Sequence, residues 1–399
     1  MSRTFPEVII APDVFRWLCG TSGFTAADIS KKIEVSENLI RTWCDGAKKP
    51  VLSLTKVEQL SEMFKRPLAA FLLSQPPVEP SLPKDFRKHP DSQPGFSKET
   101  LLVIRKARRL QQIRHELLDN LHLPSQVALK IRSLDDDPET AAGEERERSG
   151  IIVSGDTPGI TPVKAFDIWR GWFEQQNISV LKMKMPVEDA RGFSLTDAEP
   201  YVIVINSADA DRARLFTLFH EYAHILLNIP VVCNQDSEEV EEFAAVERWC
   251  NHFAGAFLVP RENLPGNRHI RQALQSKNYS RAAGSISQHF LISREAALMR
   301  LLTLEYLSPS QFRQERDRHR QEVAMRESQK KEKDLAAEEE EGGFGGISLD
   351  KKCVAEKGAG YVALVMKNIQ DGHISNSDAL EYLDVKLRHL EKFQESMGV

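Results

Sequence analysis

The sequence predicts a predominantly α-helical protein of the α+β class. Outside a Pro-rich stretch and a charged stretch, most of the chain repeats apolar residues three and four positions apart, as amphipathic helices do. Two short stretches, residues 178–185 and 201–206, instead have the alternating or apolar pattern of strands. With 399 residues, of which 41% are hydrophobic, the chain can form two or three compact units, and a single domain is not expected.

Residues 215–228 predict a buried amphipathic helix, because they contain no Gly or Pro and space their apolar side chains three and four apart. They also contain a His-Glu-x-x-His box at His220, Glu221 and His224. Residues four apart share a face of a helix, so the two imidazoles can bind one metal ion. Glu221, one step round the helix, would stand beside the attacking water. This is the arrangement of a zinc metallohydrolase.

The box alone has a simpler explanation, a chance match on a core helix, which is expected in roughly one chain in a hundred of this length. A third ligand would exclude it, since catalytic zinc takes three protein ligands and keeps one open position. Residues 237–260 form a second helix-like run, on which Glu247 lies beside the apolar stripe. A half-buried carboxylate needs a partner, and a metal ion is a suitable one.

Two motifs resemble the ImmA/IrrE family of bacterial metallopeptidases: His-Glu-Tyr-Ala-His, and the run Glu-Arg-Trp-Cys-Asn-His-Phe-Ala that begins at Glu247. In that family the Glu four residues before the Asn of an Asn-x-Phe-Ala signature is the third zinc ligand. The resemblance therefore implies that Glu247 binds zinc together with the two histidines, and that Asn251 lies next to these ligands. The family often has Gly before the second His, where this chain has Ala223, which is also small.

Three other side chains compete with Glu247 for the role of third ligand: Glu241, Glu242 and His252. The two acids fit the solvated face of an acidic first helical turn. His252 is the neighbour of Asn251 in the sequence and fits a structural role.

The resemblance implies a minigluzincin-like zincin fold with a small β-sheet. It also implies a zinc-dependent endopeptidase in which Glu221 is the general base. Such proteins cleave a transcriptional repressor or another regulatory protein in stress responses or mobile-element control. The alternative is a DNA-binding regulator or antitoxin whose zincin domain binds or senses a partner such as a PIN-like nuclease toxin. Residues 201–206, just before the metal-binding helix, either hold a substrate peptide at the sheet edge or form a plain core strand.

Residues 25–50 predict two short helices that meet at a tight corner, with Ser36 as a natural N-cap of the second. The apolar residues that join them are Ile29, Ile33, Val35, Ile40 and Trp43. The run resembles the Cro/repressor-like (XRE) helix-turn-helix family. In that family Trp-x-x-Gly-x-x-x-Pro follows the recognition helix, as Trp43, Gly46 and Pro50 do here.

The XRE resemblance implies a five-helix helix-turn-helix domain at residues 1–75 that binds double-stranded DNA. The residues it places at the DNA are Glu37, Asn38 and Arg41, towards the major groove, and Lys48 and Lys49, near the phosphates. The alternative is a helix-turn-helix kept for protein contacts, because basic residues only slightly outnumber acidic ones in this module.

Four further segments follow the N-terminal domain. Residues 76–155 are a Pro-rich connector and a helical linker region, with a long helix near 98–120. The zincin metallopeptidase domain is expected at residues 156–310. Residues 311–346 form a charged tether, either an exposed helix or a disordered segment. Residues 347–399 recover a helical pattern and are expected to pack as a small helical C-terminal region.

Composition bears on location, partners and thiols. The chain has no run of eighteen apolar residues and no basic-then-apolar N-terminus, so we expect a cytoplasmic protein without membrane contact. A net charge of −5 argues against indiscriminate nucleic-acid binding by the whole molecule. A homodimer is one assembly that we expect. The scattered cysteines predict reduced, mostly buried thiols. They are Cys19, Cys44, Cys233, Cys250 and Cys353.

Overall fold

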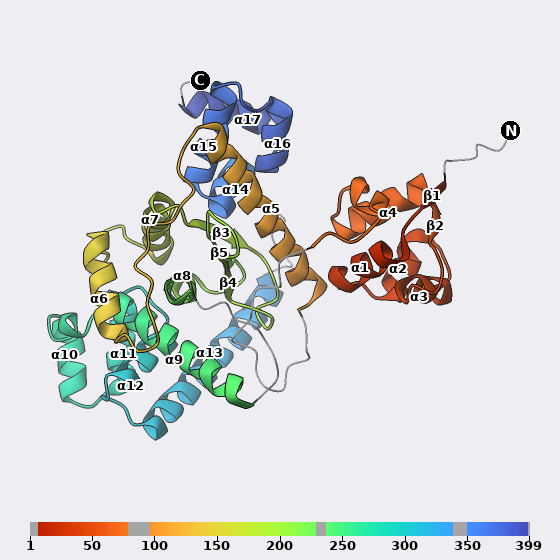
Figure 1. Ribbon diagram of the computed structural model, residues 1–399. Helices are drawn as coiled ribbons and strands as arrows, with labels where there is room; N and C mark the ends of the chain where they lie inside the picture. The colour runs from red at the N-terminus through yellow and green to blue at the C-terminus, as the bar shows by residue number, and fades with distance from the viewer. Residues whose placement is uncertain (1–6, 79–95, 229–236, 338–348, 398–399) are drawn as a thin grey trace. The chain divides into compact units, whose positions relative to one another are not determined.

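The structure, a computed structural model, describes residues 7–78, 96–228, 237–337 and 349–397. It is mostly helical with two small sheets (Figure 1), which confirms the predicted α+β, predominantly α class. Among the described helices, none combines the length and apolar character that crossing a bilayer requires. The chain divides into two compact units, Met1–Arg109 with Lys184–Ala190, and Leu110–Met183 with Arg191–Val399.

The first unit contains two strands, four α-helices and a 3₁₀ helix within residues 7–72. In chain order these are β1 (Glu7–Ile9), α1 (Pro12–Ser22), α2 (Ala26–Ile33), α3 (Glu37–Cys44), β2 (Val51–Ser53), α4 (Leu54–Phe64) and η1 (Leu68–Leu72). β1 pairs with β2 in antiparallel orientation, so the start of the unit is tied to the segment that follows α3. The five helical segments agree in number with the expectation, although the last is a 3₁₀ helix.

α2 and α3 are the two short helices that residues 25–50 predicted. Thr25 starts α2 in a reciprocal capping box with Asp28. Glu34 follows α2 with a φ of 52°, a left-handed conformation that turns the chain towards α3. Ser36 takes the predicted N-cap position of α3, but its side chain makes no capping hydrogen bond. The buried side chains that join the helices include Ile29, Ile33, Ile40 and Trp43.

The second unit contains a three-stranded sheet of β3 (Ser179–Met183), β4 (Gly192–Leu195) and β5 (Val202–Asn206). The strand order is β3-β5-β4, with β5 parallel to β3 and antiparallel to β4. β5 is therefore the central strand, and all five of its residues are buried. The hypothesis that residues 201–206 hold a peptide at a sheet edge is wrong, because both edges of β5 are already paired. These residues form the core strand that was the alternative.

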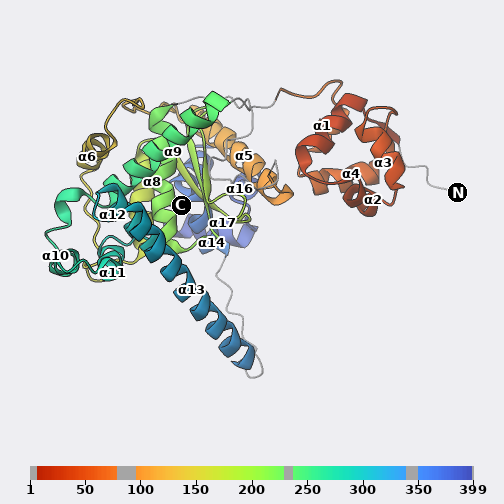
Figure 2. The same ribbon diagram turned by 90° about the horizontal axis from the view of Figure 1, so that it is seen from below.

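The helices between residues 138 and 303 are α6 (Pro138–Ser149), α7 (Pro162–Gln175), α8 (Asp211–Leu227), α9 (Ser237–Leu258), η2 (Arg261–Asn263), α10 (Arg268–Gln275), α11 (Tyr279–His289) and α12 (Arg294–Thr303). Of these, α7 packs on β3, and α8 packs on β4 and β5. α8 and α9 pack side by side (Figure 2). Phe219 of α8 stacks on Phe257 of α9 with ring centroids 4.0 Å apart, and Trp169 of α7 meets both rings edge-on. This aromatic contact fixes three helices against one another.

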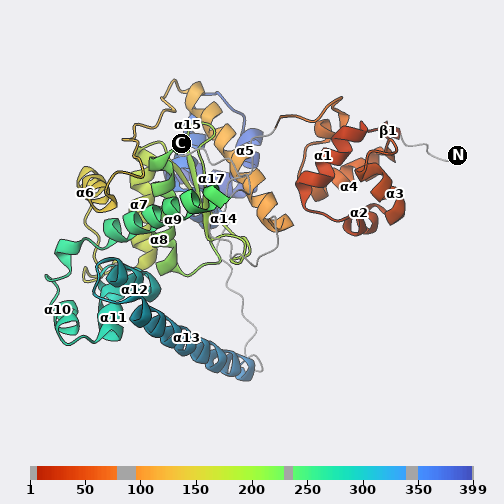
Figure 3. The ribbon, with the colours of Figure 1, turned by 60° about the horizontal axis from the view of Figure 1, so that its bottom comes forward.

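The charged segment and the C-terminal region are helical where described. Their helices are α13 (Pro309–Ala337), α14 (Leu349–Lys357), α15 (Ala359–Gln370), α16 (Asn376–Leu383) and α17 (Leu387–Met397). α13 packs on α12 at its start and then extends away from it (Figure 3). α14 packs on β3, where Arg170 of α7 donates to the carbonyl oxygens of Ala355 and Glu356, each at 2.9 Å. The C-terminal helices thus cover part of the second unit.

A buried ion pair ties the start of α6 to α9 and α12. Arg300 is 1% exposed and donates to both carboxylate oxygens of Glu139, with Nη2 2.9 Å from Oε2. Its Nε donates to the carbonyl of Val259, and His252 lies 2.8 Å from Glu139 Oε1. Burial alone would raise the pKa of Glu139, but Arg300 and His252 outweigh it and hold that pKa at about 2.

We expect Glu139→Gln to lower the free energy of unfolding by roughly 1–3 kcal/mol at pH 7, because it leaves the Arg300 guanidinium buried without its counter-charge. The folded pKa lies below the ordinary value of about 4.3, so this contribution is present above that pH and is lost as the pH falls towards 2. Urea unfolding of both proteins at several pH values measures it. Glu147→Gln, an exposed position on the same helix, is the control. Equal losses in the two variants would contradict the assignment.

Candidate metal centre

α8 presents two histidines on one face. His220 is 1% exposed and His224 is 9% exposed, so both imidazoles are turned into the protein. Their Nε2 atoms lie 3.1 Å apart, as the four-residue spacing on a helix predicts. The helix begins after Ala210 and ends at Asn228, whose backbone NH donates to the carbonyl of His224. The second histidine therefore stands in the last turn, where the regular helix still fixes its direction.

α9 brings a carboxylate to the same point. Glu247 Oε1 lies 3.1 Å from His224 Nε2, and Oε2 lies 3.5 Å from His220 Nε2. Burial alone would raise the pKa of Glu247, but the two adjacent histidines outweigh it and hold that pKa at about 2. The side chain is therefore an anion at neutral pH. Within the part of the chain that the structure describes, these three residues are the cluster of His, Cys, Asp and Glu side chains that could hold a metal ion.

The separations fit a tetrahedral zinc site. Ligand atoms about 2.0–2.1 Å from a tetrahedral ion lie about 3.3 Å from one another, and the three distances here are 3.1, 3.1 and 3.5 Å. Glu247 Oε1 is also buried and receives no hydrogen bond of normal geometry from the described residues. Burying a carboxylate oxygen without a hydrogen bond raises the free energy of the folded protein unless a cation binds to that oxygen. Two imidazoles and one carboxylate, with a fourth position left open, are the donor set of a catalytic zinc ion.

Two further side chains of α9 face the other ring nitrogens. Asn251 Oδ1 lies 3.1 Å from His220 Nδ1, and Cys250 Sγ lies 3.5 Å from His224 Nδ1. A partner on Nδ1 fixes the orientation of a ring and directs Nε2 to the metal position. Sequence reasoning expected Asn251 near the ligands and did not anticipate Cys250. The available signal was that position 250 follows Glu247 by three residues and so shares its helix face.

Glu221 follows His220 directly on α8 and is 6% exposed. Strand β4 approaches it closely at Gly192, where an added Cβ would lie 3.4 Å from Glu221 Cγ and 2.7 Å from Thr217 Cγ2. A side chain at this position would push β4 away from α8. The glycine therefore allows the end strand of the sheet to lie against the helix that carries the His-Glu-x-x-His box.

Of the three residues that compete with Glu247 for the role of third ligand, the structure describes the side chain of one. His252 Nε2 lies 2.8 Å from Glu139 Oε1, in the ion-pair network of α6, and is not part of the metal cluster. The side chains of Glu241 and Glu242 lie outside the described residues, so the structure does not compare them with Glu247.

The residues proposed to face DNA lie at the surface of the first unit. Arg41 pairs with Glu37 on α3, with Nη2 2.6 Å from Oε1, so part of its charge is neutralised within the helix. Asn38 is exposed on the same helix, and Lys48 and Lys49 are exposed in the segment after it. The three α3 side chains are thus at least partly exposed, although the helix itself buries Ile40 and Trp43, and the two lysines follow it in the chain.

A small sheet beside a His-Glu-x-x-His helix, with a Glu supplied by the next helix, defines a zincin-like metallopeptidase domain. The comparison with protein families agrees. Residues 173–302 match the peptidase M78 family model, described as the IrrE N-terminal-like domain. This span contains the sheet, both histidines and Glu247, whereas residues 7–72, which carry α1 to α4, lie outside it. No curated protein and no solved structure gives a significant match to the chain.

Proposed function

We propose that the protein is a zinc-dependent endopeptidase that cleaves a regulatory protein, such as a transcriptional repressor, and that its first unit binds double-stranded DNA. The observation that supports the peptidase is the convergence of His220, His224 and Glu247, with ligand atoms 3.1 to 3.5 Å apart. A stress response or the control of a mobile element is the setting that we propose for this activity.

The reaction uses the residues of α8 and α9 in separate roles. His220, His224 and Glu247 would hold the zinc ion. The chemistry that zinc supplies when bound is Lewis acidity, for the scissile carbonyl and for a water whose pKa falls to about 7. Glu221 would act as the general base, accepting the proton of the attacking water and passing it to the nitrogen of the leaving amine.

Strand β4 is our candidate for the substrate-binding edge. Among the described residues it pairs with β5 alone, so its other edge can accept an extended peptide. Because Gly192 brings β4 against Glu221 and Thr217, a peptide added there would run next to the general base. This transfers to β4 the role that the sequence hypothesis gave to residues 201–206.

We expect Glu221→Gln to keep zinc and fold but to lose cleavage by roughly 100-fold or more, because the amide cannot accept the water proton. The measurement is cleavage of purified proteins encoded by neighbouring genes, with zinc content determined in parallel. Glu262→Gln, an exposed position on η2, is the matched control and should cleave like wild type. If the wild type cuts no partner and Glu221→Gln regulates equally well in cells, the peptidase proposal fails. The regulator or antitoxin with a PIN-like toxin partner would then take its place.

The proposal that the first unit binds DNA can be tested separately from the peptidase. The full-length protein should bind a duplex from its own promoter region, with an affinity that falls steeply as salt is added. Lys48→Ala with Lys49→Ala should weaken binding to all sequences, whereas Arg41→Ala should relax the base preference. Lys351→Ala, an exposed lysine on α14, is the control for loss of positive charge. If no duplex binds even at low salt, the unit is a protein-contact module.

A further inference from the structure

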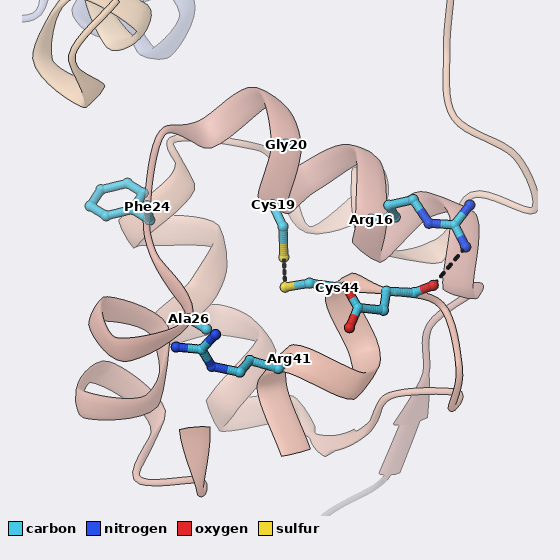
Figure 4. Close-up of a pocket in the computed structure, with 8 residues that line it drawn as sticks. Arg16, Cys19, Gly20, Phe24, Ala26, Arg41 and Cys44 are labelled. Carbon is cyan, nitrogen blue, oxygen red and sulfur yellow. Dashed lines mark hydrogen bonds between the residues drawn. The ribbon is translucent and has the colours of Figure 1, made fainter. Parts of the chain in front are cut away.

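Two cysteines that are distant in the sequence meet in the first unit. Cys19 lies on α1 and Cys44 is the last residue of α3, yet their Sγ atoms are 2.8 Å apart (Figure 4). Both side chains are partly exposed, and both line a pocket of about 360 Å³ together with Arg16, Gly20, Phe24, Ala26, Arg41 and Asp45. The expectation of scattered thiols did not anticipate this pairing, because nothing in the sequence brings positions 19 and 44 together.

We propose that Cys19 and Cys44 are an oxidation-sensitive thiol pair, which hydrogen peroxide converts into a disulfide between α1 and the end of α3.

The helices already hold the pair in place. A disulfide bond is about 2.0 Å long, so the sulfurs need to approach by only about 0.8 Å. Phe15, one turn before Cys19, packs edge-on against Trp43, the neighbour of Cys44, with ring centroids 5.7 Å apart. Arg16 donates to the carbonyl of Asp45 at 3.1 Å. Contacts on both sides of the sulfurs therefore fix α1 against α3 and keep the two sulfurs close together.

The two thiols differ in acidity. The hydrogen bond shared by the sulfurs lowers the pKa of Cys44, against the opposing effects of its burial and of Asp45. The same hydrogen bond, together with burial, raises the pKa of Cys19. Cys44 is therefore the more acidic of the two thiols, and we assign it the role of nucleophile and Cys19 the role of the thiol that resolves the product.

One molecule of hydrogen peroxide is the only oxidant that formation of this disulfide needs. The Cys44 thiolate attacks one oxygen, the O–O bond breaks, and the other oxygen takes up a proton and leaves as water. The sulfenic acid on Cys44 is then attacked by Cys19. The S–S bond forms as the S–O bond breaks, and hydroxide leaves with the Cys19 proton as a second water. Two electrons pass from the two thiols to the peroxide.

The surroundings favour selective oxidation at this pair. The pocket gives a small oxidant access to both sulfurs, and the cationic side chains of Arg16 and Arg41 line it. By contrast, Cys250 is 0% exposed and Cys353 is 4% exposed. Cys44 is also one turn from Arg41 on α3, so oxidation would restrain the helix that we propose contacts DNA. That consequence rests on the DNA-binding proposal, whereas formation of the disulfide does not.

The test uses the full-length protein with Cys233→Ser, which removes the cysteine that lies outside the described residues. The protein is treated with stoichiometric hydrogen peroxide, alkylated, digested without reductant and examined by mass spectrometry. We expect an intramolecular Cys19–Cys44 disulfide that dithiothreitol reverses, formed at least about tenfold faster than oxidation of Cys353. Cys19→Ser should leave a sulfenic acid on Cys44 that dimedone traps, and Cys44→Ser should slow oxidation of Cys19 by a similar factor.

Two results would overturn the proposal. One is oxidation of Cys19 and Cys44 no faster than that of the buried Cys353. The other is a disulfide that joins two chains and disappears on dilution. Because the wild-type pair is measured directly, the outcome does not depend on the folding of either serine variant, on DNA binding or on peptidase activity.

Discussion

The packing of α8 on α9 is the constraint on which the metal centre depends. Neither helix holds enough ligands alone, since α8 supplies His220 and His224 and α9 supplies Glu247. The stack of Phe219 on Phe257, with centroids 4.0 Å apart, sets the distance between the helices. A cavity at this contact would let the carboxylate drift from the imidazoles, and ligand separations tolerate only a few tenths of an ångström. The aromatic core is therefore part of the site, although it touches no reacting atom.

Two partly buried glutamates of the second unit have similarly lowered pKa values but different partners. Glu139 and Glu247 both titrate at about 2. The counter-charge of Glu139 is Arg300, whose guanidinium has no lone pair to offer a metal, so that pair joins helices. The neighbours of Glu247 are imidazoles, and a neutral imidazole can offer a ring-nitrogen lone pair to a metal ion. A lowered pKa alone therefore does not identify a functional carboxylate, and the identity of its partner does.

The sequence could predict what lies within one helix. His220 and His224 follow from a four-residue spacing, and the start of α2 follows from a local cap. Contacts between different helices and strands could not be predicted from the sequence in this way. The pairing of β5 on both edges, the contact of Cys250 with His224 and the meeting of Cys19 with Cys44 depend on how distant segments pack, which local periodicity does not record. Glu247 was an intermediate case, because its place beside an apolar stripe predicted burial and the family resemblance supplied its role.

The claim that α9 completes a metal site begun on α8 is tested most directly by the zinc content of two matched variants. Wild type, Glu247→Ala and Glu241→Ala are purified with zinc, dialysed together and measured by atomic absorption. The arrangement predicts close to one zinc per chain in wild type and in Glu241→Ala, and loss of most of that zinc in Glu247→Ala, because two imidazoles alone bind the ion weakly. Full retention of zinc by Glu247→Ala, or loss of zinc from Glu241→Ala instead, would contradict the assignment of the third ligand.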